Sequence, residues 1–174
     1  MNVERQSLVI TDNSFLHYYL FNTKLVFIMN LIVNDLPCTA TIGQTLGRAA
    51  WLNHSHVGCV CAGRGICQTC YVTVLEGNDC LSPLSEVEKA FLSERQIQSG
   101  GRLACQTRLE RDGTISILSR PEEVQRLLLH NLTGLFAYGA TMGKDTASQI
   151  VPGIQNLAGR ISRGEVHPID GSAS

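Results

Sequence analysis

The sequence predicts an α+β protein, with one small mixed sheet crossed by a helix and a mostly helical extension at the C-terminus. Between residues 29 and 120, short segments of alternating apolar and polar residues are separated by turn residues and by two segments of helical character. Beyond residue 120, apolar residues recur at helical spacing and are punctuated by glycines. A chain of 174 residues is long enough for one domain with an appendage.

Three parts follow from this pattern: an N-terminal extension over residues 1–28, a domain over 29–120 and a C-terminal attachment region over 121–174. Residues 1–28 end in an aromatic and aliphatic stretch that has the periodicity of neither a strand nor a helix. Met29 stands at the first residue of the first predicted strand. We therefore interpret Met29 as a candidate start of the chain, with residues 1–28 upstream of it.

The first predicted strands form a hairpin, in which Leu31 and Val33 alternate with polar residues and Asn34-Asp35 supplies the turn. Residues 38–42 form the returning strand. Residues 45–54, TLGRAAWLNH, have the composition and apolar spacing of a short helix packed on this hairpin.

A cysteine-rich loop separates that helix from a clear strand, CYVTVLEG. In the following segment, SPLSEVEKAFLSER, Ser85 is the expected cap of a helix with Glu86 and Glu88 in its first turn. The segment RLACQTRLE leads to Gly113 and a last alternating strand, TISIL. The acidic residues Glu76, Asp79, Glu86 and Glu88 form either a docking face for a redox partner or an ordinary solvated helix start.

Composition excludes several classes of protein. A net charge of -1 and a pI of about 6.5 provide no basic field for nucleic acid. No uncharged apolar run reaches about 18 residues, so no transmembrane helix is predicted, and the N-terminus lacks the features of a secretory signal. Seven cysteines, an odd number in a chain of this length, favour a reducing, cytoplasmic setting in which clustered cysteines bind metal more often than one another.

Four cysteines have the spacing of an iron–sulfur site. Five residues separate Cys61 from Cys67, two separate Cys67 from Cys70, and 34 separate Cys70 from Cys105. Three thiolates from one loop and a fourth from a distant segment is the way in which a [2Fe-2S] cluster is held, with two thiolates on each iron. Glycines between the first two cysteines allow the backbone to wrap around a compact inorganic core and to direct N–H groups at its sulfurs.

Other interpretations of the same residues are weaker. Four thiolates also bind zinc, but the unequal spacing, the glycine-rich loop and the isolated fourth cysteine disfavour a zinc site. His54 and His56 raise the alternative of a Rieske centre, although four cysteines already complete the site. We expect Cys59 to be a partly buried structural thiol, with Cys38 and Cys80 as packing residues.

The segments CAGRGICQTC, LEGNDCLSPLSEVEKAFL and GRLACQT together resemble the [2Fe-2S] ferredoxins of the β-grasp fold, over residues 29–120. The five-residue gap resembles the adrenodoxin-like and bacterial branch, since plant-type ferredoxins have four residues there. The resemblance implies that Cys61, Cys67, Cys70 and Cys105 ligate a [2Fe-2S] cluster. It also implies one-electron transfer rather than enzymatic catalysis, because the sequence shows no nucleophile or catalytic base.

The apolar, glycine-punctuated segment after residue 126 makes the chain similar to the iron–sulfur proteins of the chlorosome envelope in green photosynthetic bacteria. That resemblance implies a peripheral position on the cytoplasmic side of the envelope and redox control of light harvesting by reduction of quenching species. The expected partners are a redox protein or quinone-type acceptor, together with envelope lipid or protein bound by the C-terminal region. Two alternatives remain: a structural envelope protein braced by its cluster, and a soluble module that donates electrons to an oxygenase or dehydrogenase.

Within the C-terminal region, Pro121 opens one predicted amphipathic helix and another follows Pro152. Arg160 and Arg163 are expected on the flank opposite the apolar face, near lipid headgroups. The glycines argue against one long helix, so several short helices are predicted. The glycines concerned are Gly134, Gly139, Gly143, Gly153 and Gly159.

Overall fold

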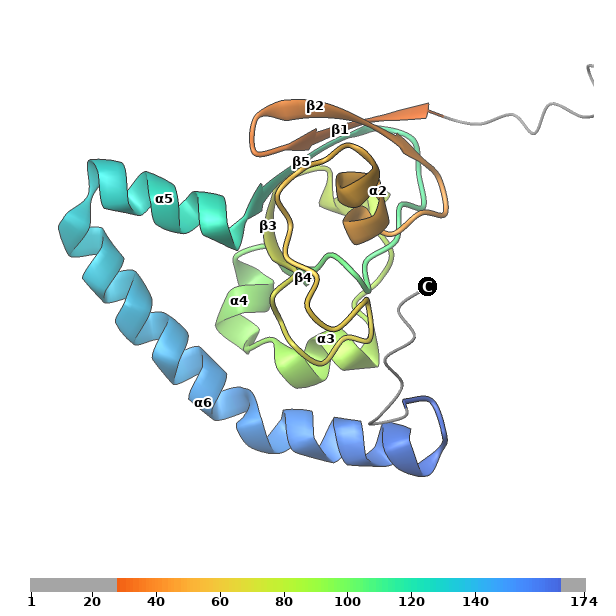
Figure 1. Ribbon diagram of the computed structural model, residues 1–174, viewed down its shortest axis with the longest axis vertical. Helices are drawn as coiled ribbons and strands as arrows, with labels where there is room; N and C mark the ends of the chain where they lie inside the picture. Colours follow the sequence, from red (N-terminus) through yellow and green to blue (C-terminus); the bar gives the residue numbers. More distant parts are fainter. Residues whose placement is uncertain (1–27, 167–174) are drawn as a thin grey trace, which may run out of the picture.

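The computed structural model describes residues 28–166, which form a mixed five-stranded sheet with helices packed against it and a long helical arm (Figure 1). The strand order is β2-β1-β5-β3-β4, and only the pairing of β1 with β5 is parallel. The strands are β1 (Ile28–Val33), β2 (Leu36–Thr41), β3 (Tyr71–Glu76), β4 (Gly101–Leu103) and β5 (Thr114–Ser119). The predicted α+β class is confirmed, and the predicted extension over residues 1–28 lies outside the described residues except for Ile28.

The hairpin of β1 and β2 has the predicted two-residue turn, with Val33 paired to Leu36. Asn34 and Asp35 both adopt positive φ, 54° and 64°, which is the backbone that a tight hairpin turn requires. Asn34 also ties the hairpin to the end of β5, because its amide bonds both the backbone N–H and the hydroxyl of Ser119.

The core lies between the sheet and the helices that cross it. Helix α2 (Leu46–Leu52) begins at Thr45, whose hydroxyl accepts a hydrogen bond from the Arg48 N–H. Apolar side chains from the sheet and from α2 are fully buried together; they include Leu31, Val33, Leu46, Ala49, Ile115 and Ile117. A 3-10 turn, η1 (Asn78–Cys80), follows β3.

The helix predicted after Ser85 is divided into two short helices, α3 (Glu86–Phe91) and α4 (Glu94–Gln98). Each begins with a complete capping box, Ser85 with Glu88 and Ser93 with Gln96. The predicted cap at Ser85 is therefore confirmed. The second serine interrupts the helix because its side chain bonds the Gln96 N–H and so starts a new helix.

The C-terminal region differs from the prediction of several short helices. Helix α5 (Arg120–His130) leads away from the sheet, and α6 (Leu132–Ser162) then returns as a single helix of 31 residues that passes beside α3 and α4 (Figure 1). The bend of α6 in Figure 1 is of the kind that an internal proline produces, and Pro152 lies within it.

Tertiary contacts explain why the glycines do not end this helix. A Cβ built on Gly153 would lie 3.0 Å from the Phe91 ring, so the glycine allows α6 to approach α3 closely. Asp145 forms an ion pair with Arg95 of α4. The intrinsic cost of a glycine in a helix, about 1 kcal/mol, is offset here by packing. No helix within residues 28–166 is long and apolar enough to span a membrane.

Candidate metal centre

The sheet brings Cys70 and Cys105 together. Cys70 immediately precedes β3 and Cys105 follows β4, and these neighbouring antiparallel strands pair Tyr71 with Leu103. The Ala104 N–H extends the pairing by donating to the Cys70 carbonyl at 2.9 Å. As a result the two sulfurs lie 3.2 Å apart, although 34 residues separate them in sequence.

Cys61 and Cys67 form a second pair at the two ends of the glycine-rich loop. The side chain of Cys61 hydrogen-bonds to that of Cys67, and the Thr69 hydroxyl lies 3.0 Å from the Cys67 sulfur. Burial raises the pKa of Cys67, but the hydrogen bonds from Thr69 and Cys61 outweigh burial and hold this pKa below its usual value. The loop thus favours the thiolate form, which is the form that binds iron.

The Cys70 and Cys105 thiols share one proton unequally. The hydrogen bond from Cys70, and then those from Gln106 and Gly65, lower the pKa of Cys105 to about 6 against the opposing effect of burial. The pKa of Cys70 is raised, first by its hydrogen bond to Cys105 and then by burial. Two such thiols pressed together are stabilised as a pair of thiolates when a cation binds between them.

The loop between Cys61 and Cys67 has the left-handed backbone that the glycines predict. Gly63 and Gly65 have φ values of +83° and +65°. Gly65 is also crowded, since an added Cβ would lie 2.7 Å from Val87 and 2.9 Å from the Gln106 amide. The loop is therefore held closely against the segment that carries Cys105.

Gln106 joins the loop to the fourth cysteine, a role that our sequence analysis missed. Its Nε2 donates to the Gly63 carbonyl at 2.9 Å and to the Cys105 sulfur at 3.4 Å. The signal available in the sequence was its position directly after a candidate ligand, within GRLACQT.

Glu88 was predicted among surface acids, and the structure corrects this, because its side chain is fully buried. The carboxylate receives hydrogen bonds from Arg102, from the Thr107 hydroxyl and from the Leu103 N–H, at 2.9–3.3 Å. Burial raises the pKa of Glu88, but Arg102 and the surrounding donors outweigh it and leave the pKa below its usual value. Glu88 thus braces both sides of the turn that carries Cys105 rather than a docking face.

The donor set fits a two-iron cluster better than a single metal ion. Within residues 28–166, no three cysteine, histidine, aspartate or glutamate side chains gather as the ligands of one ion would. The four candidate thiols instead lie in two pairs, and each iron of a [2Fe-2S] cluster takes two thiolates. This arrangement disfavours the zinc alternative, which needs four ligands around one centre.

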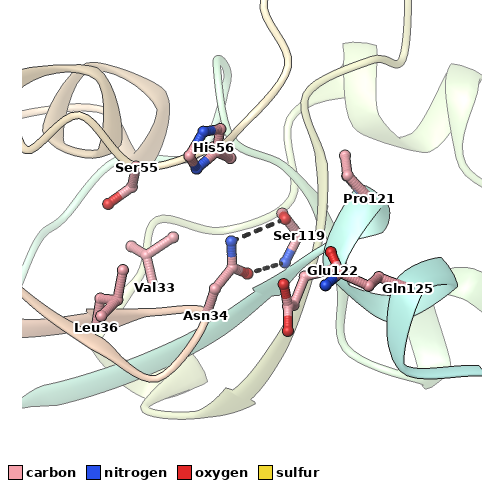
Figure 2. Close-up of a pocket in the computed structure, with 9 residues that line it drawn as sticks. All are labelled: Val33, Asn34, Leu36, Ser55, His56, Ser119, Pro121, Glu122 and Gln125. Atoms are coloured by element: carbon pink, nitrogen blue, oxygen red, sulfur yellow. Dashed lines mark hydrogen bonds between the residues drawn. The ribbon is translucent and has the colours of Figure 1, made fainter. Parts of the chain in front are cut away.

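The other cysteines and the histidines lie apart from these pairs. Cys38 and Cys80 are buried in the core, as predicted, whereas Cys59 is exposed, contrary to prediction, because it lies at the outer part of the loop. His56 lines a cavity of about 300 Å³ between the hairpin turn and the start of α5, with Val33 and Pro121 among the other lining residues (Figure 2). The exposed His56 therefore lies against the hairpin and α5, which does not support a Rieske centre.

Comparison with known proteins agrees with this geometry. Residues 32–110 match the family model of the 2Fe-2S iron-sulfur cluster binding domain. The chain is 62% identical to chlorosome protein I of Chlorobaculum tepidum over 79% of its own length and 57% of that protein. It is 41% identical to chlorosome protein J of the same organism over 82% of its length and 64% of that protein.

A third similarity is confined to the sheet domain: the chain is 38% identical to one subunit of the Na(+)-translocating NADH-quinone reductase of Chlamydia felis, over 51% of its length and 20% of that protein. The chain thus spans only part of each of these curated relatives. The predicted β-grasp ferredoxin class and the predicted [2Fe-2S] cofactor are confirmed. Residues 32–110 therefore belong to the 2Fe-2S iron–sulfur cluster binding family, in a chain related to chlorosome proteins I and J.

Proposed function

We propose that Cys61, Cys67, Cys70 and Cys105 hold the [2Fe-2S] cluster and that the protein carries single electrons between partners. The observation that carries this proposal is the arrangement of the four thiols in two contacting pairs. When bound, the cluster accepts and releases one electron. The chain itself supplies thiolates, directs N–H groups at sulfur and limits access of water.

The loop tip is the surface through which we expect electrons to enter and leave. Cys59 and Val60 are exposed at this tip, next to the half-buried Cys61. Cys70, in contrast, is buried under the sheet. A redox partner that docks on residues 59–63 would therefore approach the iron held by Cys61 and Cys67.

We place this activity at the chlorosome envelope, on its cytoplasmic side, in redox control of light harvesting. The similarity to chlorosome proteins I and J supports that setting. The helical arm supplies a means of attachment, because large apolar side chains are exposed around the joint of α5 and α6. These are Leu128, Leu129, Leu132 and Phe136. Contact with envelope lipid keeps the carrier close to its acceptor.

A second candidate is an electron-donor module of a larger redox enzyme. The similarity to part of an NADH-quinone reductase favours it, and a quinone-type acceptor fits both settings. Under this alternative the helical arm binds an enzyme instead of lipid.

The first experiment asks whether the four cysteines hold a reducible cluster. The full chain, Cys105→Ser and the matched control Cys59→Ser are prepared anaerobically, and their visible spectra, iron content and EPR signals after dithionite are compared. We expect the wild type and Cys59→Ser to give a red-brown protein with a reversible rhombic signal near one spin per cluster. Cys105→Ser should lose the cluster or change the signal.

Two results would contradict the proposal. A colourless protein that retains zinc would refute the cluster. A coloured protein that cannot be reduced without collapse would support a structural role for the cluster instead of electron transfer.

A further inference from the structure

The C-terminal half of α6 lies beside the cysteine loop and reaches it directly. Ile66 and Gln68 of the loop face Ile154 and Leu157 of α6 across a groove of about 280 Å³. Beyond this groove, near the end of α6, the Arg160 Nη2 donates a hydrogen bond to the Arg64 carbonyl at 2.8 Å. This contact contradicts the prediction that Arg160 lies on an outer flank near lipid.

Arg160 is held in this position although its hydrogen bonding is incomplete. Its side chain is only 11% exposed, and its Nε lies 3.7 Å from Glu165. Its Nη1 is buried and has no hydrogen-bond partner among the described residues. Burying part of a guanidinium without a partner is unfavourable, so a compensating interaction with a nearby negative charge is expected.

The acceptor of this hydrogen bond belongs to a peptide group that also faces the candidate centre. The Arg64 carbonyl and the Gly65 N–H form one trans peptide, so they point in opposite directions. The Gly65 N–H hydrogen-bonds to the Cys105 sulfur. Arg160 and Cys105 are thus joined through the two ends of a single peptide dipole.

The physical effect of this chain has a definite sign. A cation on the carbonyl oxygen polarises the peptide and strengthens the hydrogen bond that its N–H donates. Hydrogen bonds to the sulfurs of an iron–sulfur centre stabilise its more negative, reduced state and so raise its potential.

We propose that Arg160 is a positioning residue of the redox centre, which acts through the Arg64–Gly65 peptide to orient and strengthen the hydrogen bond to the Cys105 sulfur and so raises the reduction potential. This inference rests on the proposed function, since it requires a cluster held by Cys105. It makes α6 part of the electron carrier as well as an attachment arm.

The test compares three variants of the full chain with the wild type. Arg160→Met removes the donor and the charge at similar length, and Arg160→Lys keeps a charged donor. Arg163→Met is the matched control, because Arg163 lies on the same helix end but is exposed and pairs with Glu165. The midpoint potential is measured by EPR-monitored titration. Arg160→Met should shift to a more negative potential, Arg160→Lys should lie between it and the wild type, and Arg163→Met should stay close to the wild type.

A second measurement uses the protein without its cluster. Hydrogen–deuterium exchange of residues 62–66 should be about tenfold faster in Arg160→Met than in the wild type or Arg163→Met, because a charge-assisted hydrogen bond is lost. Equal potentials in Arg160→Met and the wild type, equal shifts in Arg160→Met and Arg163→Met, or unchanged exchange would overturn the inference. A colourless wild type would instead overturn the proposed function, so the two failures are distinguishable.

Discussion

At the scale of single residues, the cysteine loop depends on two glycines that serve it in different ways. Both have positive φ, but only Gly65 is enclosed, by Val87 and Gln106. A Cβ built on Gly63 has nothing within 4 Å. Backbone conformation is therefore the requirement at Gly63, whereas conformation and space are both requirements at Gly65.

We expect Gly65→Ala to reduce cluster occupancy much more than Gly63→Ala. The added methyl group at Gly65 pushes the loop away from Gln106, which contacts the Cys105 sulfur. Gly63→Ala adds only the strain of a left-handed residue, about 1 kcal/mol. Iron content per chain after reconstitution measures the difference. Equal occupancy in the two variants would mean that crowding at Gly65 does not control assembly.

The buried ion pair of Glu88 and Arg102 leads to a prediction about pH. The lowered pKa of Glu88 makes its carboxylate stabilising above about pH 4.5, the ordinary value of a free glutamate. This contribution is lost as the pH falls through the lower pKa of the folded state. Breaking a buried pair typically costs about 3–5 kcal/mol.

Glu88→Gln should therefore lower the free energy of unfolding at pH 7 by about 3 kcal/mol. The difference from the wild type should narrow as the pH falls below about 4.5, because the wild-type carboxylate is then protonated too. Urea unfolding of the cluster-free chain, followed by circular dichroism at several pH values, measures it. Glu86→Gln, on the exposed side of the same helix, is the control. A pH-independent difference would argue against ionised Glu88 as the cause.

At the scale of elements, helix α6 depends on its contact with α3. Gly153 faces the Phe91 ring, whereas a Cβ built on Gly143 has nothing within 4 Å. A large side chain at position 153 must push the helix away from Phe91, and the same side chain at 143 projects into open space. Leucine also has a higher helix propensity than glycine, by nearly 1 kcal/mol.

Gly143→Leu should therefore leave the chain as stable as the wild type or more stable, while Gly153→Leu should destabilise it despite the same gain in propensity. The expected loss is about 1–3 kcal/mol, the usual cost of overpacking. Thermal unfolding measures the stability, and hydrogen exchange over residues 145–160 shows whether α6 detaches. Equal behaviour of both variants would show that the Phe91 contact does not hold the helix.

The limits of prediction from sequence follow the same division between local and tertiary causes. The hairpin turn at Asn34-Asp35 and the cap at Ser85 were predictable because a few adjacent residues determine them. The continuity of α6 was not predictable, because it depends on Phe91 and Arg95, which are more than 40 positions away in sequence. The burial of Glu88 was missed for a similar reason, since Arg102 and Thr107 reach it only when β4 joins the sheet.

The candidate site shows this division within one motif. Spacing alone identified the four cysteines as a set, because three lie in one loop and the fourth in a segment of recognisable sequence. Their division into pairs depends on the pairing of β3 with β4, which periodicity does not reveal. The contact of Arg160 with the loop depends in turn on the path of α6.

At the scale of the whole molecule, charge and apolar surface are distributed unequally. Residues 29–120 carry eight acidic and eight basic side chains, which gives a net charge of zero. Long-range electrostatic steering of a charged partner to this domain is therefore weak. The exposed apolar side chains at the joint of α5 and α6 lie at the end of the helical arm farthest from the sheet (Figure 1). Attachment through this joint would leave the cysteine loop accessible to partners.

We expect the full chain to bind zwitterionic lipid vesicles through this joint. Leu129 and Phe136 are 67% and 80% exposed, and burying two such side chains contributes about 3–6 kcal/mol at most. Replacing both by serine should weaken sedimentation with vesicles by at least about tenfold. The visible spectrum and the midpoint potential should stay unchanged, because neither residue belongs to the loop.

The matched control is Val60→Ser, which removes an apolar side chain of similar exposure, 79%, from the loop tip. This variant should bind vesicles as the wild type does, but it should accept electrons from a protein partner more slowly. Equal vesicle binding by the wild type and the doubly substituted chain would place attachment elsewhere. It would then favour the interpretation of the helical arm as a surface that binds an enzyme.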